Sequence, residues 1–161
     1  MLDGSGHLHA LDVMTGATLW STSITGQSLY NSPPVATGGM VYVNGLESGG
    51  TTYALNGQTG AVVWSANTFD GSNGSVAIAG GAVYEAEACD QLSSFDALTG
   101  HLNWHHSGNC TGGGGAAPAV YQALIWERDW AMGDVIINTA GQAVGSFVST
   151  VIPAFSSGKA L

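Results

Sequence analysis

The chain has 161 residues, of which 45% are hydrophobic and only 8% are Asp, Glu, Lys or Arg. This apolar content excludes a disordered acidic tail, because disordered segments have few apolar residues to bury. The formal net charge of −9 argues against binding to nucleic acid or anionic lipid headgroups, since both present phosphate groups. No apolar run approaches the roughly 18 residues of a membrane-spanning helix. The first residues also lack the basic and then apolar pattern of a signal peptide.

An internal repeat is the main feature of the sequence. Its clearest form is Ala-Leu-Asp-x-x-Thr-Gly-x-x-x-Trp, with small variations between copies. The copies lie at residues 9–20, 53–64 and 94–104, and a degenerate copy without the Trp lies at 135–145. Asp or Asn followed by Gly is turn chemistry, because the side chain caps backbone amides and Gly adopts a positive φ. Each copy therefore predicts a strand, a tight turn and a second strand.

A second element lies between these copies and repeats with the same period. Each copy has a short run that contains Val or Ala, then a small residue, then an apolar strand. The copies lie at 32–43, 75–85 and 117–127. Both elements together give four short strands in each unit and no helical periodicity. Units of about 40–50 residues with four strands are typical of β-propeller blades.

In chain order, the first two strands are expected at 7–12 and 18–23 and lack two inner partners. Three complete units follow at 35–67, 75–105 and 117–147, and one or two inner strands are expected at 151–155. The fold prediction is all-β, with about four propeller blades of four antiparallel strands each. The prediction is one propeller segment over 1–161, with blade units at about 1–30 (partial), 31–70, 71–110, 111–150 and 151–161 (partial).

The repeat resembles the tryptophan-docking repeat of PQQ-like β-propellers over about residues 6–147. That family includes quinoprotein alcohol dehydrogenases and non-enzymatic relatives, among them a lipoprotein of outer-membrane protein assembly. The resemblance implies that each indole docks on the Gly turn of a neighbouring blade. The residues implied in this docking are Trp20, Trp64, Trp104, Gly16, Gly60 and Gly100.

The resemblance also implies a closed ring of seven or eight blades, so the four blades of this chain would form half or a fragment of such a ring. Four blades cannot close it, and their apolar faces and strand edges need a cover. Two explanations are open. Either the natural chain is longer, or a second copy completes an eight-bladed ring by symmetric pairing.

Two cysteines lie in one predicted unit and its flanking loop. Cys89 follows the second strand and Cys110 follows the fourth, so both loops emerge on one face of the blade. The prediction is a disulfide that closes a loop of about twenty residues and contributes about 3 kcal/mol. An oxidised pair would place the protein outside the cell or in its envelope. Two buried free thiols are the alternative.

Carboxylates gather at equivalent places in neighbouring units. Glu85 and Glu87 alternate along one strand and share a face, and the repeat puts Glu127 and Asp129 at the same places one blade later. Asp90 extends the first pair. These side chains are candidate ligands for Ca²⁺, which takes six to eight oxygens, or a candidate acid/base pair. The alternative is a solvated rim.

Two weaker patterns involve aromatic residues and histidines. Trp126 and Trp130 lie beside acidic residues and would suit an aromatic platform for a glycan, with core packing as the alternative for Trp126. His7 and His9 share a strand face but lack a third ligand in the sequence, so surface histidines are favoured over a metal site.

The function predicted from the sequence is a non-enzymatic, secreted or cell-surface propeller segment that acts as a binding or assembly scaffold. A protein partner or a second copy would complete the ring, and no cofactor is expected apart from Ca²⁺ as a candidate ion. One alternative is a fragment of a PQQ- and Ca²⁺-dependent quinoprotein dehydrogenase. The resemblance implies adjacent cysteines near the quinone of such enzymes, and this chain has none. A glycan-binding propeller is the other alternative.

Overall fold

The structure is a computed structural model that describes residues 1–46, 50–108, 113–128 and 134–147. These residues form β1 (His7–Leu11), β2 (Thr18–Ser23), β3 (Val35–Thr37), β4 (Met40–Asn44), β5 (Thr51–Asn56), β6 (Val62–Asn67), β7 (Gly71–Ser72), β8 (Ala77–Ala79), β9 (Ala82–Ala86), β10 (Leu92–Asp96), β11 (Leu102–His106), β12 (Gly113–Gly114), β13 (Ala119–Tyr121), β14 (Leu124–Arg128), β15 (Asp134–Asn138) and β16 (Ala143–Phe147). The strand expected at 151–155 lies outside the described residues.

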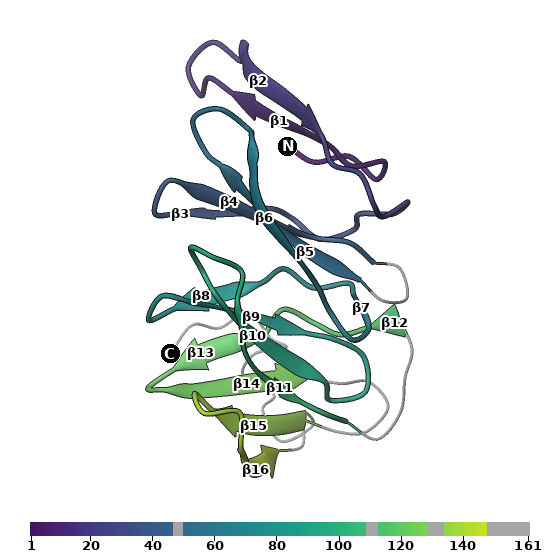
Figure 1. Ribbon diagram of the computed structural model, residues 1–161, viewed down its shortest axis with the longest axis vertical. Helices are drawn as coiled ribbons and strands as arrows, with labels where there is room; N and C mark the ends of the chain where they lie inside the picture. Colours follow the sequence, from purple (N-terminus) through teal and green to yellow (C-terminus); the bar gives the residue numbers. More distant parts are fainter. Residues whose placement is uncertain (47–49, 109–112, 129–133, 148–161) are drawn as a thin grey trace, which may run out of the picture.

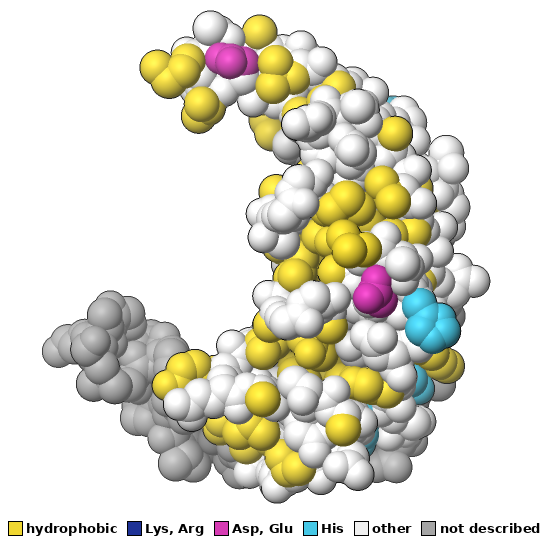
Figure 2. Space-filling view, turned by 60° about the vertical axis from the view of Figure 1, so that its left-hand side comes forward, with side chains coloured by type: hydrophobic (Ala, Val, Ile, Leu, Met, Phe, Trp, Pro, Cys, Tyr) yellow, Lys and Arg dark blue, Asp and Glu magenta, His cyan; other side chains and the backbone are white. Residues whose placement is uncertain are grey.

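Most strands belong to sheets whose order follows the chain. Three antiparallel sheets have four strands each, β3–β6, β8–β11 and β13–β16, and the first sheet has only β1 and β2. The short strands β7 and β12 lie in the two connections between successive four-stranded blades and pair with each other in parallel. The sheets are stacked along the long axis of the molecule (Figure 1) and together form an open crescent (Figure 2). The prediction of an all-β chain with about four propeller blades is confirmed.

In each blade a tight turn joins the two outer strands and fixes their register. In the β10–β11 hairpin, Asp96 accepts hydrogen bonds from the N–H groups of Leu98 and Thr99 at 3.0 and 2.8 Å. Gly100 then adopts a φ of +72°, which a residue with a Cβ rarely takes. The strand register shifts between Ser94 and Phe95. Corresponding shifts occur in the other three hairpins.

The apolar core lies between the blades. Three clusters of buried side chains each join two successive sheets. From the first boundary to the third, their main members are Leu8, Tyr53 and Leu55; Tyr42, Trp64 and Phe95; and Tyr84, Leu92 and Ile137. The apolar face of each blade is therefore buried against the next blade and not within its own sheet. Within the described residues, no helix is long and apolar enough to cross a membrane.

Candidate functional site

Tryptophans join neighbouring blades through the Thr-Gly turns. The Nε1–H of Trp20, on β2, donates a hydrogen bond to the carbonyl oxygen of Gly57 in the next blade, at 2.9 Å. The indole ring lies over Gly60, where a Cβ would be only 2.5 Å from Cε3 of the indole. Gly60 has a φ of +72°. The turn therefore needs Gly for its backbone and also to leave room for the ring.

The same contact recurs at two further blade boundaries. The Nε1–H of Trp64 donates to the carbonyl oxygen of Ala97 at 3.0 Å, and the ring covers Gly100. The Nε1–H of Trp104 donates to a carbonyl oxygen in the turn of the last blade at 2.8 Å, and its ring covers Gly141. Three indoles thus join four successive blades.

The structure places the turn at Gly16 differently. Its φ is +71°, but no atom of the described residues lies within 4 Å of the point where a Cβ would be. Gly141 was not among the predicted docking residues, although it receives Trp104. The spacing of the degenerate fourth repeat was the signal that could have identified it.

Buried carboxylates form the second candidate site, at the end of β9. Glu85 has no solvent exposure, and its Oε2 accepts a hydrogen bond from the hydroxyl of Thr52 on the preceding blade at 2.5 Å. Its Oε1 has no hydrogen-bond partner among the described residues. Burial raises the pKa of Glu85 well above its usual value, and the nearby Glu87 carboxylate adds to this. The environment therefore favours the neutral acid.

Glu87 lies just beyond β9 in a network of hydrogen bonds. Its Oε2 accepts from the backbone N–H of Asp70 at 2.5 Å, and its Oε1 accepts from the hydroxyl of Ser93 at 2.6 Å. Asp70 in turn accepts from the side-chain amide of Gln91 at 2.8 Å. Burial raises the pKa of Glu87, although these hydrogen bonds act in the opposite direction.

The Thr52–Glu85 contact replaces an apolar contact at the previous blade boundary. The repeat aligns Thr52 with Leu8 and Glu85 with Val43, and both Leu8 and Val43 are buried in one apolar cluster. Glu127, on β14, aligns with Glu85 one blade later and also has no solvent exposure. At this position of the repeat, an apolar residue (Val43) lies at the first blade boundary, and acids (Glu85 and Glu127) occur in the later blades.

The solvated-rim interpretation is wrong for Glu85, Glu87 and Glu127, because all three are fully buried between blades. Asp129 lies outside the described residues, and Asp90 is half-buried. Among the residues that the structure describes, no three His, Cys, Asp or Glu side chains form a group that could hold a metal ion. Both oxygens of Glu87 already accept protein hydrogen bonds. The chemistry that these carboxylates show in the structure is polar contact between blades.

The family model described as outer membrane protein assembly factor BamB matches residues 4–151. The chain belongs to the BamB family. This family of β-propeller repeat proteins accounts for the period of the sequence, and the predicted relationship to PQQ-like propellers is confirmed. Among curated protein sequences, none matches this BamB-family chain significantly.

Solved structures share the fold of this BamB-family chain at low sequence identity. A computationally designed protein is 13% identical with a TM-score of 0.75 over 89% of this chain. Quinohemoprotein alcohol dehydrogenases from Pseudomonas putida and Comamonas testosteroni are 16% and 15% identical, with TM-scores of 0.74 and 0.73 over 92% and 91% of it. The chain covers 44% of the designed protein and 32% of each dehydrogenase, so it spans less than half of their length.

The predicted disulfide stays a prediction, because Cys110 lies outside the described residues. Cys89 is buried and has a φ of +66°. Gly108 packs directly on its carbonyl group, where a Cβ would not fit. The segment that leads to Cys110 therefore approaches Cys89 closely.

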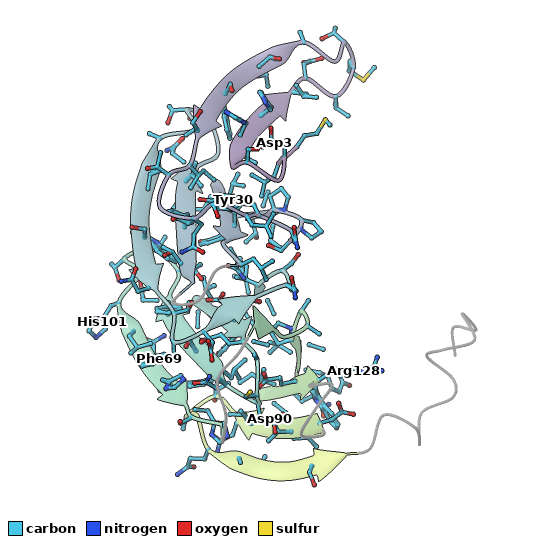
Figure 3. All side chains as sticks on the ribbon, turned by 90° about the vertical axis from the view of Figure 1, so that its right-hand side faces the viewer. Asp3, Tyr30, Phe69, Asp90, His101 and Arg128 are labelled. Carbon is cyan, nitrogen blue, oxygen red and sulfur yellow. The ribbon has the colours of Figure 1, made fainter. Side chains whose placement is uncertain are left out.

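The remaining candidate residues lie apart from the carboxylates. The Nδ1 of His7 is 3.0 Å from a carboxylate oxygen of Asp3, while His9 is half-buried. Trp126 is half-buried on β14, and Trp130 lies outside the described residues. Phe69 stacks on His105 with ring centroids 3.5 Å apart, and Figure 3 shows Phe69 on the convex side of the crescent.

Proposed function

We propose that this chain is a non-enzymatic propeller segment that acts as a binding or assembly scaffold. The observation that carries the proposal is the open crescent, whose blades are stabilised across their faces by their neighbours. The first sheet has two strands and exposes apolar side chains at its turn, with Val13 93% and Met14 87% exposed. Such a surface suits contact with further blades.

A protein partner or a second copy of the chain completes the ring in this proposal. Each boundary inside the crescent combines an apolar cluster with an indole hydrogen bond, so a further blade has a defined surface to meet. The family name, which refers to an assembly factor, supports a partner of protein nature.

The proposed location is the cell envelope or the extracellular space. Support comes from the family name, which refers to the outer membrane. The close approach of Gly108 to Cys89 supports the proposed Cys89–Cys110 disulfide. Disulfides persist in oxidising compartments such as the periplasm or the cell exterior.

A dehydrogenase fragment is the competing function, and the fold shared with two quinohemoprotein alcohol dehydrogenases is the observation in its favour. The test is to add PQQ and Ca²⁺ to the purified chain and to follow dye reduction with alcohols as substrates. We expect no reduction above the rate of PQQ and Ca²⁺ without protein. Saturable, protein-dependent reduction that Glu85→Gln abolishes would overturn the scaffold proposal.

Light scattering separates the two ways of completing the ring. A mass near twice 16.3 kDa is expected if a second copy completes it, and a mass near 16.3 kDa is expected if the missing blades belong to a longer natural chain or to a partner of different sequence.

A further inference from the structure

The hydroxyl of Thr52, at the boundary between the second blade (β3–β6) and the third (β8–β11), lies close to two side-chain oxygens. It is 2.5 Å from Oε2 of Glu85 and 3.2 Å from the side-chain oxygen of Asn44, its partner on β4. A threonine hydroxyl has one hydrogen, so it can donate to only one of these oxygens at a time. At most 1% of each of the three side chains is exposed, so an oxygen without a donor is costly here.

A proton on Glu85 supplies the missing hydrogen. The neutral acid donates from Oε2 to the hydroxyl oxygen of Thr52, and the Thr52 hydrogen is then free to bond Asn44. The side-chain amide of Asn44 donates in turn to the carbonyl oxygen of Gly74, at 3.1 Å, between β7 and β8. Three hydrogen bonds then run from the third blade into the second and back to the segment that enters the third.

The ionised form of Glu85 cannot satisfy the same residues. The Thr52 hydrogen turns to the carboxylate, and the side-chain oxygen of Asn44 loses the donor that the structure gives it. Within the described residues, Oε1 of Glu85 has no hydrogen-bond partner, so the Thr52 hydrogen is the one donor to the charge. Loss of the proton therefore weakens the contact between the blades at Glu85 and again at Asn44.

The charged group that acts on Glu85 is the carboxylate of Glu87, two residues along the chain on the same face. Burial and this neighbour both raise the pKa of Glu85. Both oxygens of Glu87 accept hydrogen bonds, from the N–H of Asp70 and the hydroxyl of Ser93. The groups that face Glu85 from β4 and β5 are an amide and a hydroxyl, which carry no charge. Of the two acids, Glu85 is therefore the one that retains its proton.

We propose that Glu85 is a proton-operated lock between the second and third blades. Protonated, it completes the chain of hydrogen bonds through Thr52 and holds the two blades together. Ionised, it breaks this chain, and the boundary opens locally more often. At the first boundary the repeat aligns Val43 and Leu8 with these two residues, and neither side chain titrates. The inference does not depend on the proposed scaffold function.

Carbon-13 NMR of the full chain, labelled at the side-chain carboxyl groups of glutamate, detects the proton on Glu85 directly. The sequence has four glutamates, and the signal that Glu85→Gln removes belongs to Glu85. We expect this signal to titrate well above pH 4.5, the usual midpoint of a glutamate. A midpoint at or below that value would mean that the folded chain holds an ionised Glu85, and the inference would then be wrong.

Amide hydrogen exchange shows whether this proton holds the boundary. Protection factors, from which the intrinsic pH dependence of exchange is removed, are compared below and above the titration midpoint of Glu85. We expect protection in β5 and β9 to fall about tenfold on ionisation, the effect of one lost hydrogen bond. Protection in β1 and β2, which do not touch this boundary, should stay the same. Glu85→Gln should keep full protection at both pH values, because its amide donates to Thr52 as the neutral acid does.

Two substitutions at Thr52 are the matched controls. Thr52→Ser keeps the hydroxyl and should keep the pH dependence of the wild type. Thr52→Val removes the hydroxyl and should lower protection in β5 and β9 at both pH values, while circular dichroism checks that the strands are retained. If Thr52→Val does not fold, the comparison of the wild type with Glu85→Gln still decides. Equal protection of the wild type on both sides of the midpoint, or an equal fall in Glu85→Gln, would show that Glu85 is not a lock.

Discussion

Gly100→Ala should destabilise the fold far more than Gly16→Ala, although the two turns have the same backbone. Both glycines have a left-handed φ, +72° at Gly100 and +71° at Gly16. An Ala at either position therefore carries the same backbone strain, about 1–2 kcal/mol. Any difference in the free energy of unfolding between the two variants therefore measures the indole contact and not the strain of the turn.

The difference in stability arises from the Cβ that Ala adds at residue 100. At Gly100 it would lie 2.6 Å from two ring atoms of Trp64. This ring is held between Tyr42 and Phe95, whose ring centroids are 6.0 and 6.4 Å away, so it cannot move aside freely. Overpacking of this kind costs about 1–3 kcal/mol, and a displaced indole also loses about 1 kcal/mol of hydrogen bonding. Gly100→Ala should therefore lose about 2–4 kcal/mol more than Gly16→Ala.

Urea unfolding followed by circular dichroism measures both variants. For a chain of this size, that difference moves the midpoint by about 1–2 M. Gly80→Ala is a second control, because Gly80 has a φ of +59° and open space at its Cβ. Equal midpoints for Gly100→Ala and Gly16→Ala would refute the reasoning that the indole, and not the turn alone, requires Gly.

Three further predictions concern the carboxylates and the cysteines. Glu85→Gln should flatten the pH dependence of the free energy of unfolding. Burial raises the pKa of Glu85 in the folded state, so the wild type is most stable below the usual pKa of 4.5. It loses stability as the pH rises from there through the raised folded-state pKa. Urea midpoints at about pH 4 and about pH 8 check this, and an unchanged slope contradicts it. Thr52→Val should cost about 1–3 kcal/mol of unfolding free energy by removing the donor to Glu85. The double variant Thr52→Leu/Glu85→Val, which copies the apolar pair of the first boundary, should recover most of that loss in the same assay. Cys89→Ser should lower stability by about 3 kcal/mol in non-reducing buffer, whereas equal losses with and without dithiothreitol would argue against the disulfide.

The blades could be predicted from the sequence because their signals are local. The hydrogen bonds of each turn join residues within a few positions, such as Asp96 with Leu98 and Thr99. These bonds set the hairpin register whatever the neighbouring blade does. The degenerate fourth copy hid the role of Gly141, since its turn from Asn138 to Gly141 is one residue shorter than the other turns and the copy has no Trp of its own.

The burial of the carboxylates could not be predicted in the same way, because it depends on contacts between blades. Alternation places Glu85 and Glu87 on one face of a strand, but it does not say what covers that face. The hydroxyl that bonds Glu85 comes from Thr52, 33 residues earlier in the chain. In a stack of blades, both faces of an inner sheet are covered, so an acid on either face is removed from water.

The acids also bear on the order of the blades. At the first boundary Leu8 and Val43 are buried in one apolar cluster, and at the second boundary the aligned residues are Thr52 and Glu85. A stack in which Glu85 met Leu8 would leave the acid buried without its donor. An unsatisfied buried group of this kind costs about 1–3 kcal/mol. The indole contacts are the same at each boundary and cannot distinguish one blade from another, whereas this polar pair stabilises only the native sequence of blades.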